Sequence, residues 1–366
     1  MRRRELIITL GGVAATVAWP FVVRAQQPTR MPVVGVLWHG TREKELSNPF
    51  YHWVVQGFED VGLKSGLNIT LDHQFADESD ARYNVLAPQM AARRPDVLVA
   101  IALPPTLALK KVHDDIPLIF LGSLDPIALR VVDSLAKRTE AITGIVATGI
   151  DLSAKRLQIL KQAVPSLSRV ALLVNPKTKS TTDNDIREYG EAAKLLSVST
   201  RPFEIGEYDE VAAAFSRITE WQGDGVILSQ TPLFALIREE LAHAALSSHL
   251  PMMAFSDTFV SSGALASYGS SLRELFLAGG ALVKRVLKGE RAGDIPVLQP
   301  TKFELVVNMT TADTLGLTFS PPFLASVDRV IESAMFIGPA LFVGQSTTDG
   351  RHLIARLIAP QTQASG

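Results

Sequence analysis

Short apolar runs alternate with segments of helical spacing along most of this chain, and this alternation limits the possible folds more than any other feature. Leu118–Leu121 is one such run; it lies between a proline and a glycine, as a strand buried on both faces would. In Phe50–Val61 the apolar residues recur at helical spacing, which predicts a helix that packs one face on a sheet. Alternating strands and helices predict an α/β fold with parallel strands covered by helices on both faces.

The alternation forms two consecutive runs that separate near residue 150, and 366 residues are enough for about two domains. We therefore expect two similar lobes rather than one large sheet. The expected strands are Pro32–Leu37, Asn68–His73, Val97–Ile101, Leu118–Leu121, Ile142–Val146, Arg169–Val174, Ser197–Phe203, Gly225–Leu228, Met252–Phe255, Leu265–Ser267 and Phe303–Asn308. The expected helices include Ala128–Leu135, Glu207–Trp221, Leu233–His249 and Ser271–Lys288. The tail, residues 333–366, does not fit the pattern, and we expect a surface appendage there.

The composition excludes several classes of function. Lysine and arginine number 36 against 37 aspartates and glutamates, a formal charge of −1, so the chain lacks the basic character typical of nucleic-acid binding. It has no cysteine, which excludes disulfides, thiolate metal sites and cysteine nucleophiles. Neither a Gly-x-Ser-x-Gly elbow nor a P-loop is present, and the seven histidines lack metal-ligand spacing. We expect no enzymatic activity, no metal and no cofactor.

The N-terminus has the three parts of a secretory signal peptide. Arg2–Arg4 form a basic region, Leu6–Phe21 is apolar, and small residues precede a cleavage point after Ala25. The apolar run is too short to span a bilayer and contains Pro20. We expect residues 1–25 to be removed on export to the periplasm, by either the general or the twin-arginine route.

Polar and aromatic residues follow the predicted strands in both lobes, where open α/β sheets bind their ligands. Two lobes whose strand ends face each other form a cleft that can close around a small molecule. Each residue of this kind also serves as a helix cap or a turn residue in many proteins, and both interpretations stay open. The candidate ligand-binding residues are Trp38, His39, Thr106, Ser123, Asp125, Asn175, Ser180, Thr181, Ser229, Gln230, Thr231, Asp257 and Tyr268.

Several segments together resemble the periplasmic substrate-binding proteins of ABC transporters, in the group whose better-known members bind tryptophan, tyrosine or phenylalanine. The matching segments are Arg2–Glu5, Val34–Leu37, Pro95–Leu98, Ile116–Phe120 with Asp125-Pro126, Gly263–Gly269, Leu287–Glu290 and Gln299–Asn308. The resemblance extends from the signal peptide to about Glu332.

The resemblance implies a two-lobed type I periplasmic binding protein fold, with the chain crossing between lobes three times. Lobe one would contain residues 31–147 and 271–296, and lobe two residues 148–270 and 297–332. The implied function is the solute-binding component of an ABC importer, which binds a small polar or aromatic solute between the lobes. Its partners would be that solute and the membrane permease, with no nucleic acid, and we expect a monomer.

Some turns differ from those of the amino-acid-binding members. Leu103-Pro104 replaces a threonine-proline turn, Ser180-Thr181 an asparagine-serine pair, and Thr231-Pro232 an aspartate-asparagine pair. A buried ammonium group needs a carboxylate partner, for which Asp257 and Asp125 are the candidates. The identity of the ligand stays open. An exported enzyme, a sensor-linked binding protein and a copy that no longer binds remain alternatives.

Overall fold

The computed structural model describes residues 30–113, 115–124, 141–148 and 152–332. The predicted signal peptide 1–25, the predicted helix Ala128–Leu135 and the tail 333–366 lie outside the described residues. From Pro32 onward the described chain forms one compact unit, and all contacts reported below lie within it. None of its described helices is long and apolar enough to cross a membrane.

The first sheet has five parallel strands in the order β2-β1-β3-β4-β5. These strands are β1 (Val33–Trp38), β2 (Thr70–Phe75), β3 (Val97–Ile101), β4 (Leu118–Leu124) and β5 (Ile142–Thr148). All five positions of β3 are buried. Val97, Val99 and Ile101 pack into one cluster, and Leu98 and Ala100 into another. Both faces of the strand are therefore covered, which explains its uninterrupted apolar sequence.

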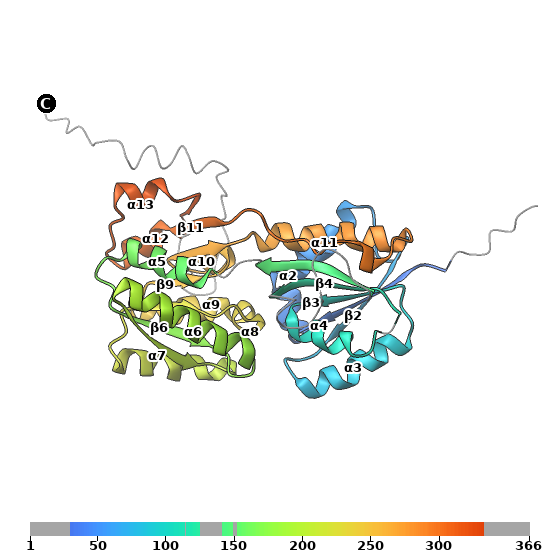
Figure 1. The fold of residues 1–366 in the computed structure, drawn as a ribbon, viewed down its shortest axis with the longest axis horizontal. Coiled ribbons are helices and arrows are strands. Elements are labelled where there is room, and N and C mark those ends of the chain that lie inside the picture. The colour runs from blue at the N-terminus through green and yellow to red at the C-terminus, as the bar shows by residue number, and fades with distance from the viewer. Residues whose placement is uncertain (1–29, 114, 125–140, 149–151, 333–366) are drawn as a thin grey trace, which may run out of the picture. The chain divides into compact units, whose positions relative to one another are not determined.

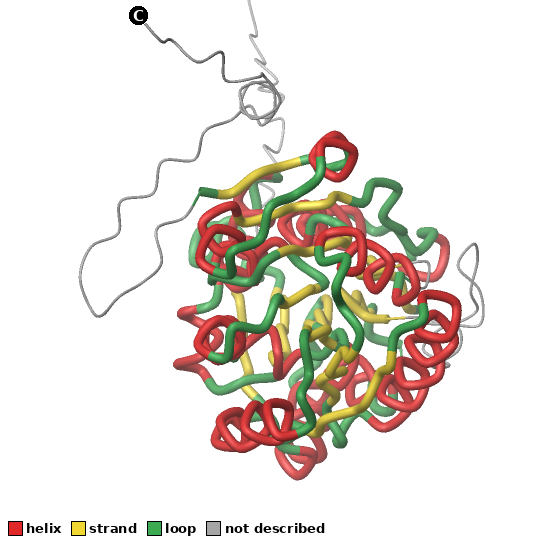
Figure 2. Tube along the Cα trace, turned by 90° about the vertical axis from the view of Figure 1, so that its left-hand side faces the viewer, coloured by secondary structure: helices red, strands yellow, loops and turns green. Residues whose placement is uncertain are grey.

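Helices cover the two faces of this sheet (Figure 1), as they do those of the second sheet, which faces the viewer in Figure 2. Those on the first sheet are α1 (Arg42–Ser47), α2 (Pro49–Asp60), α3 (Asp80–Ala92), α4 (Leu103–Lys110) and α11 (Leu272–Leu287). Although α11 is far from the others in sequence, it packs against α2 and β4 (Figure 1). The two helices meet at Gly57 and Gly280, where a Cβ on Gly280 would lie 1.8 Å from the Gly57 carbonyl oxygen. Only glycine permits this close approach of two backbones.

The second sheet has seven strands in the order β12-β11-β10-β9-β8-β6-β7. They are β6 (Arg169–Val174), β7 (Ser199–Glu204), β8 (Gly225–Leu228), β9 (Met252–Ala254), β10 (Ala266–Gly269), β11 (Glu304–Asn308) and β12 (Arg329–Ile331). Its strands are parallel except for the pair β10–β11, where the sequence pattern predicts a parallel sheet throughout. The chain leaves at Gly269 to form α11 and re-enters at Glu304, opposite Gly269. Because exit and entry are at the same end, β11 runs in the reverse direction.

The helices around the second sheet also depart from the sequence-based boundaries at two places. The longer segments are α5 (Ser153–Ala163), α6 (Lys179–Leu196), α7 (Val211–Glu220) and α9 (Arg238–Ser247). The short ones are α8 (Pro232–Leu236), α10 (Asp257–Ser261), α12 (Met309–Thr314), α13 (Pro321–Ala325) and the 3₁₀ turns Tyr208–Glu210 and Ala292–Asp294. The single helix expected over Leu233–His249 is divided into α8 and α9 at Ile237, whose dihedral angles (φ −106°, ψ 28°) are not helical. The helix expected over Glu207–Trp221 begins with a 3₁₀ turn.

Connections between the elements of the two sheets lie side by side. The backbone N–H of Leu298 donates to the Gly144 carbonyl at 2.9 Å, and Val146 N–H donates to the Leu298 carbonyl at 3.0 Å. The Ser270 hydroxyl donates to the Ala147 carbonyl at 2.5 Å. Segments from three parts of the chain are thus hydrogen-bonded beside the pocket described next. The lobe boundaries given above remain a prediction.

Candidate functional site

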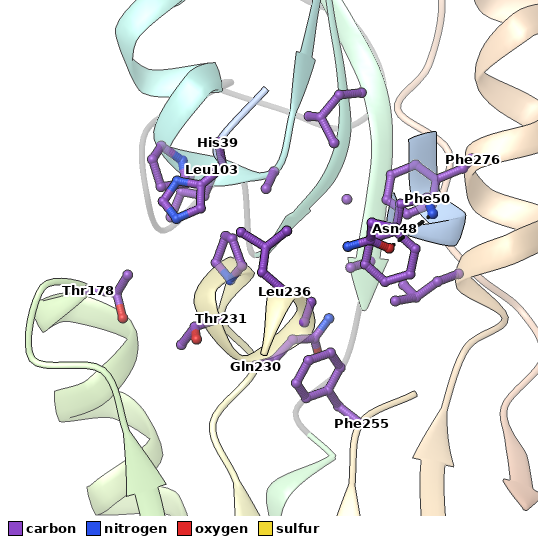
Figure 3. Close-up of a pocket in the computed structure, with 18 of the residues that line it drawn as sticks. His39, Asn48, Phe50, Leu103, Thr178, Gln230, Thr231, Leu236, Phe255 and Phe276 are labelled. Carbon is purple, nitrogen blue, oxygen red and sulfur yellow. Dashed lines mark hydrogen bonds between the residues drawn. The ribbon is translucent and has the colours of Figure 1, made fainter. Parts of the chain in front are cut away.

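A pocket lies where the carboxyl ends of strands from both sheets meet short helices. Elements of the first sheet supply Ile101 at the end of β3 and Leu103 at the start of α4, and elements of the second supply Gln230 and Leu236. Figure 3 shows Leu236 extending from α8 toward the side where His39 and Leu103 lie. The pocket encloses about 770 Å³ of empty space, part of it open to solvent.

Much of the pocket wall is aromatic or aliphatic. Phe50 of α2 and Phe276 of α11 lie with ring centroids 5.1 Å apart, and Phe255 follows β9 on the opposite side. All three rings are at least nine-tenths buried. A wall of this kind binds the aromatic or aliphatic part of a solute through burial of apolar surface.

Ala102 lines the pocket in an unusual backbone conformation, φ 74° and ψ 179°, that is essentially confined to glycine. Its N–H donates to the Leu121 carbonyl at 2.8 Å, and its own carbonyl accepts from the Thr106 hydroxyl at 2.6 Å. These two bonds hold the strained residue between β3 and α4. Leu103 and Pro104, which follow it in the chain, line the pocket.

Asn48 lies between α1 and α2 and caps the second of these helices. Its Oδ1 accepts from the Phe50 N–H at 3.1 Å, and Pro49 occupies the first helical position. The cap fixes the orientation of the amide, because only an oxygen can accept this bond. The side chain is 2% exposed, and Nδ2 has no hydrogen-bond partner among the described residues. A buried donor lines the pocket unsatisfied.

Glu45 supplies a buried carboxylate to the same wall. It is 4% exposed, and its Oε1 accepts from the Gly40 N–H at 2.8 Å. Burial raises the pKa of this carboxyl from 4.5 to about 7; the Gly40 bond opposes the rise and the charge of Glu78 adds to it. The neighbouring Lys44 pairs with Glu78 at 2.9 Å, and within the described part of the chain no ion pair to Glu45 is found.

His39 faces the pocket as a neutral imidazole. Burial lowers its pKa from 6.5 to about 4, and the charge of Glu78 partly offsets this. Its Nδ1 lies 2.6 Å from the Tyr83 hydroxyl, whose own pKa burial raises. At neutral pH the ring can therefore offer a hydrogen bond but no positive charge.

Four of the residues expected from the sequence line this pocket: His39, Thr181, Gln230 and Thr231. The Thr231 hydroxyl also caps α8 by accepting from the Phe234 N–H at 3.3 Å. No hydrogen bond of the Gln230 amide to another described residue is found, which leaves this amide available to a ligand.

Six other candidates lie away from the pocket wall. Trp38 is fully buried in the core, with Nε1 donating to His73 Nδ1 at 3.0 Å. Thr106 is buried and bonded to Ala102, as described above. Asn175 caps a turn by accepting from the Lys177 N–H at 2.9 Å.

The remaining three of these six lie in or directly after strands of the second sheet and have structural partners. The Ser229 hydroxyl donates to Asp185, and Asp257 pairs with Arg329 of β12. The Tyr268 ring lies beside that of Phe303, with centroids 6.4 Å apart, and its backbone carbonyl accepts from Arg156 Nε at 2.8 Å. The side chains of Ser123 and Ser180, and all of Asp125, lie outside the description.

Sequence reasoning did not find Glu45, Asn48 or the three phenylalanines of the wall. Asn48-Pro49 is a typical helix start, so the cap could have been recognised. Glu45 carries no comparable local signal, because what distinguishes it is burial. The structure also shows no group of three or more metal-ligating side chains among its described residues.

Comparisons with known proteins bear on this site. The sequence model described as ABC transporter substrate binding protein matches residues 47–331. The chain is similar to a tyrosine-binding protein of Clostridioides difficile (strain R20291), with 27% identity over 270 residues, 72% of this chain and 75% of that protein. These matches confirm the predicted family resemblance.

Solved structures with the same fold are also found. A conserved domain protein from Vibrio cholerae superposes with a TM-score of 0.74 and 22% identity, covering 82% of this chain and 100% of that one. An ABC domain from Streptococcus pneumonia in complex with L-Trp superposes with a TM-score of 0.73 and 22% identity, covering 82% of this chain and 99% of that one. With the two helix-covered sheets, they confirm the predicted α/β fold class of type I periplasmic binding proteins.

Proposed function

Since the chain belongs to the family of ABC transporter substrate-binding proteins, we propose that it is the solute-binding component of an ABC importer. The proposed solute is small and has an aromatic or apolar body, as an aromatic amino acid or a related carboxylate has. The observation that carries this proposal is the pocket lined by Phe50 and Phe276 on one side and by Phe255 and Gln230 on the other.

Because elements of both sheets line the pocket, this arrangement supports solute binding that is coupled to closure of the two walls around the solute. A solute that touches elements of both sheets stabilises the conformation in which both walls are in contact with it. Such a change is how a binding protein can signal to a permease that it is loaded. A tyrosine-binding relative and an L-Trp complex of the same fold support the choice of aromatic amino acids as the first solutes to test.

Export to the periplasm and docking to a permease complete the proposal. Its support is the sequence of residues 1–25, which has the features of a cleaved signal peptide. The protein would act there as a monomer that delivers its solute to membrane subunits.

The test is a thermal-shift screen of the purified protein against the twenty amino acids and aromatic carboxylates. A solute at 100 times its dissociation constant stabilises the folded state by about 2.7 kcal/mol. This raises Tm by about 5 °C for a chain of this size. Absence of a shift with every compound refutes the proposal.

An exported enzyme on the same scaffold predicts a different result. If the protein is a receptor, mass spectrometry recovers every bound solute unchanged after prolonged incubation. Release of a product from any solute would instead favour the enzyme.

A further inference from the structure

We propose that Asn48 and Glu45 form the subsite for the charged head of an α-amino acid. Asn48 Nδ2 donates a hydrogen bond to the solute carboxylate, and the Glu45 carboxylate accepts from the solute ammonium group. This inference rests on the proposed function, because it assigns the polar contacts of that same pocket.

The two side chains are placed to act on one small group. The Asn48 N–H donates to the Glu45 carbonyl at 3.0 Å, so the residues are one helical turn apart. Residues with this spacing have Cβ atoms about 5–6 Å apart. The carboxylate and ammonium groups of an α-amino acid are attached to one carbon atom, so both can be reached from this turn.

Asn48 supplies a donor whose use the fold itself does not explain. Its Oδ1 is committed to capping α2, while Nδ2 is buried without a partner among the described residues. Figure 3 shows the amide beside Phe50, with its nitrogen directed toward the side where Leu236 lies. An acceptor on the solute would satisfy this nitrogen.

Two further features favour a solute carboxylate as the acceptor for Asn48 Nδ2. No lysine or arginine is among the lining residues that the structure describes, so none of these offers a cation for this role. Asn48 stands at the N-terminus of α2, a helix of 12 residues, whose dipole is positive at that end.

Glu45 supplies the carboxylate that recognition of an ammonium group requires. Of the two residues expected from the sequence, Asp257 is paired with Arg329 and Asp125 lies outside the description. Among the described residues that line the pocket, Glu45 is the one carboxylate. Leu236 helps to bury it: both Leu236 Cδ1 and Glu45 Oε1 lie within 3.0 Å of the position of a Cβ on Gly40.

The charged and titratable groups near Glu45 leave room for a cation. Glu78 acts on it through its charge, and Lys44 is already paired with Glu78. Tyr83 packs against the same region as a neutral phenol. A solute ammonium would therefore supply the positive charge that this buried carboxylate lacks.

The experiment measures affinities by calorimetry at pH 7.5 with three probes: L-tryptophan, tryptamine, which lacks the carboxylate, and indole-3-propionate, which lacks the ammonium group. In Glu45→Gln, tryptophan and tryptamine should bind at least about tenfold more weakly, with indole-3-propionate little changed. In Asn48→Ser and Asn48→Asp, tryptophan and indole-3-propionate should weaken by at least about tenfold, with tryptamine spared by Ser and strengthened or spared by Asp.

The Asn48 variants separate binding from folding. Serine and aspartate are both good helix caps, so each keeps the acceptor for the Phe50 N–H while removing the amide donor. Ser320→Ala is the matched control, because Ser320 caps α13 outside the pocket. It should lower Tm and leave all three affinities unchanged.

Contrary results are distinguishable. If wild-type protein binds tryptophan and the Glu45 and Asn48 variants bind it equally well, the subsite is wrong while the proposed function stands. If the variants lose all three probes alike, the changes act on the fold and the subsite is also wrong. If wild-type protein binds none of these probes and no amino acid in the thermal screen, the proposed function fails and the subsite with it.

Discussion

Replacing Glu45 by glutamine should change how the stability of the solute-free protein depends on pH. Glutamine keeps an oxygen for the Gly40 N–H and resembles the protonated carboxyl, but it cannot ionise. The wild-type carboxyl has a pKa raised by burial from 4.5 to about 7. The folded state therefore holds this proton more tightly than the unfolded state does.

The direction in which stability changes with pH follows from this difference between the folded and the unfolded pKa. For a group whose pKa is raised on folding, the stability it contributes is fully present below its unfolded pKa and is lost as the pH rises through its folded pKa. This stability is therefore lost between pH 4.5 and about pH 7. At about 1.4 kcal/mol per pKa unit, wild-type protein loses about 3 kcal/mol over this range relative to Glu45→Gln.

The assay is thermal denaturation of both proteins without solute from pH 5 to pH 8. At about 2 °C per kcal/mol, the variant should melt about 6 °C above wild type at pH 8 and within about 2 °C of it at pH 5. Other titrating groups, His39 included, are present in both proteins and cancel in the difference. Glu43→Gln, which changes an exposed residue of the same helix, is the matched control. Its Tm should follow the same dependence on pH as that of wild type. If the Tm of Glu45→Gln and that of wild type instead change with pH in the same way, the claim that burial of this carboxylate opposes its ionisation is refuted.

Gly280→Ala places a methyl group 1.8 Å from the Gly57 carbonyl oxygen, so it should cost about 3 kcal/mol or more by denaturant titration. Gly190→Ala, on a helix with nothing within 4 Å of the new Cβ, should be neutral or stabilising. Ala102→Gly should relieve the strain at φ 74° and raise the free energy of unfolding by up to about 1 kcal/mol, and a decrease would contradict the assignment of strain. Burial lowers the pKa of His73 from 6.5 to about 4, so the stability it contributes is present above pH 6.5 and is lost as pH falls through 4. His73→Asn should therefore reduce the fall in Tm between pH 6.5 and pH 4. If the variant and wild type lose the same Tm over this range, the lowered pKa of His73 is contradicted.

Much of the fold was predictable because it follows from local patterns. The observed bounds of β3, Val97–Ile101, and of β6, Arg169–Val174, are those predicted from the sequence. Strands buried on both faces leave continuous apolar runs that are easily recognised. The reversed direction of β11 was not predictable in this way, because it depends on where the chain re-enters the sheet after forming α11.

Short elements escaped the sequence pattern for another reason. Helices α1 and α10 are six and five residues long, too short to show helical periodicity. The single helix expected over Leu233–His249 has good helical spacing throughout, but the packing of Leu236 into the pocket accompanies a break at Ile237.

The candidate site was predictable in location but not in composition. Gln230 and Thr231 line the pocket because residues after parallel strands gather at one edge of a sheet. Trp38 and Asp257 satisfy the same rule and still lie elsewhere, one in the core and the other in an ion pair with Arg329. The rule gives the edge of the sheet, while neighbouring elements decide which side chains are turned toward the pocket.

The sequence by itself determined the α/β class, the position of most strands, the family resemblance and the edge of each sheet at which the pocket lies. The class, the strands and the sheet edges depend on apolar periodicity and turn chemistry, which are local properties of the chain, whereas the family was inferred from the resemblance of several segments. Only the tertiary structure decided that Glu45 is a buried carboxylate and that Asn48 has an unused donor. Leu236, nearly two hundred residues away in the chain, packs beside Gly40 and Glu45. An exposed glutamate and a buried one have the same sequence letter, and only packing distinguishes their chemistry.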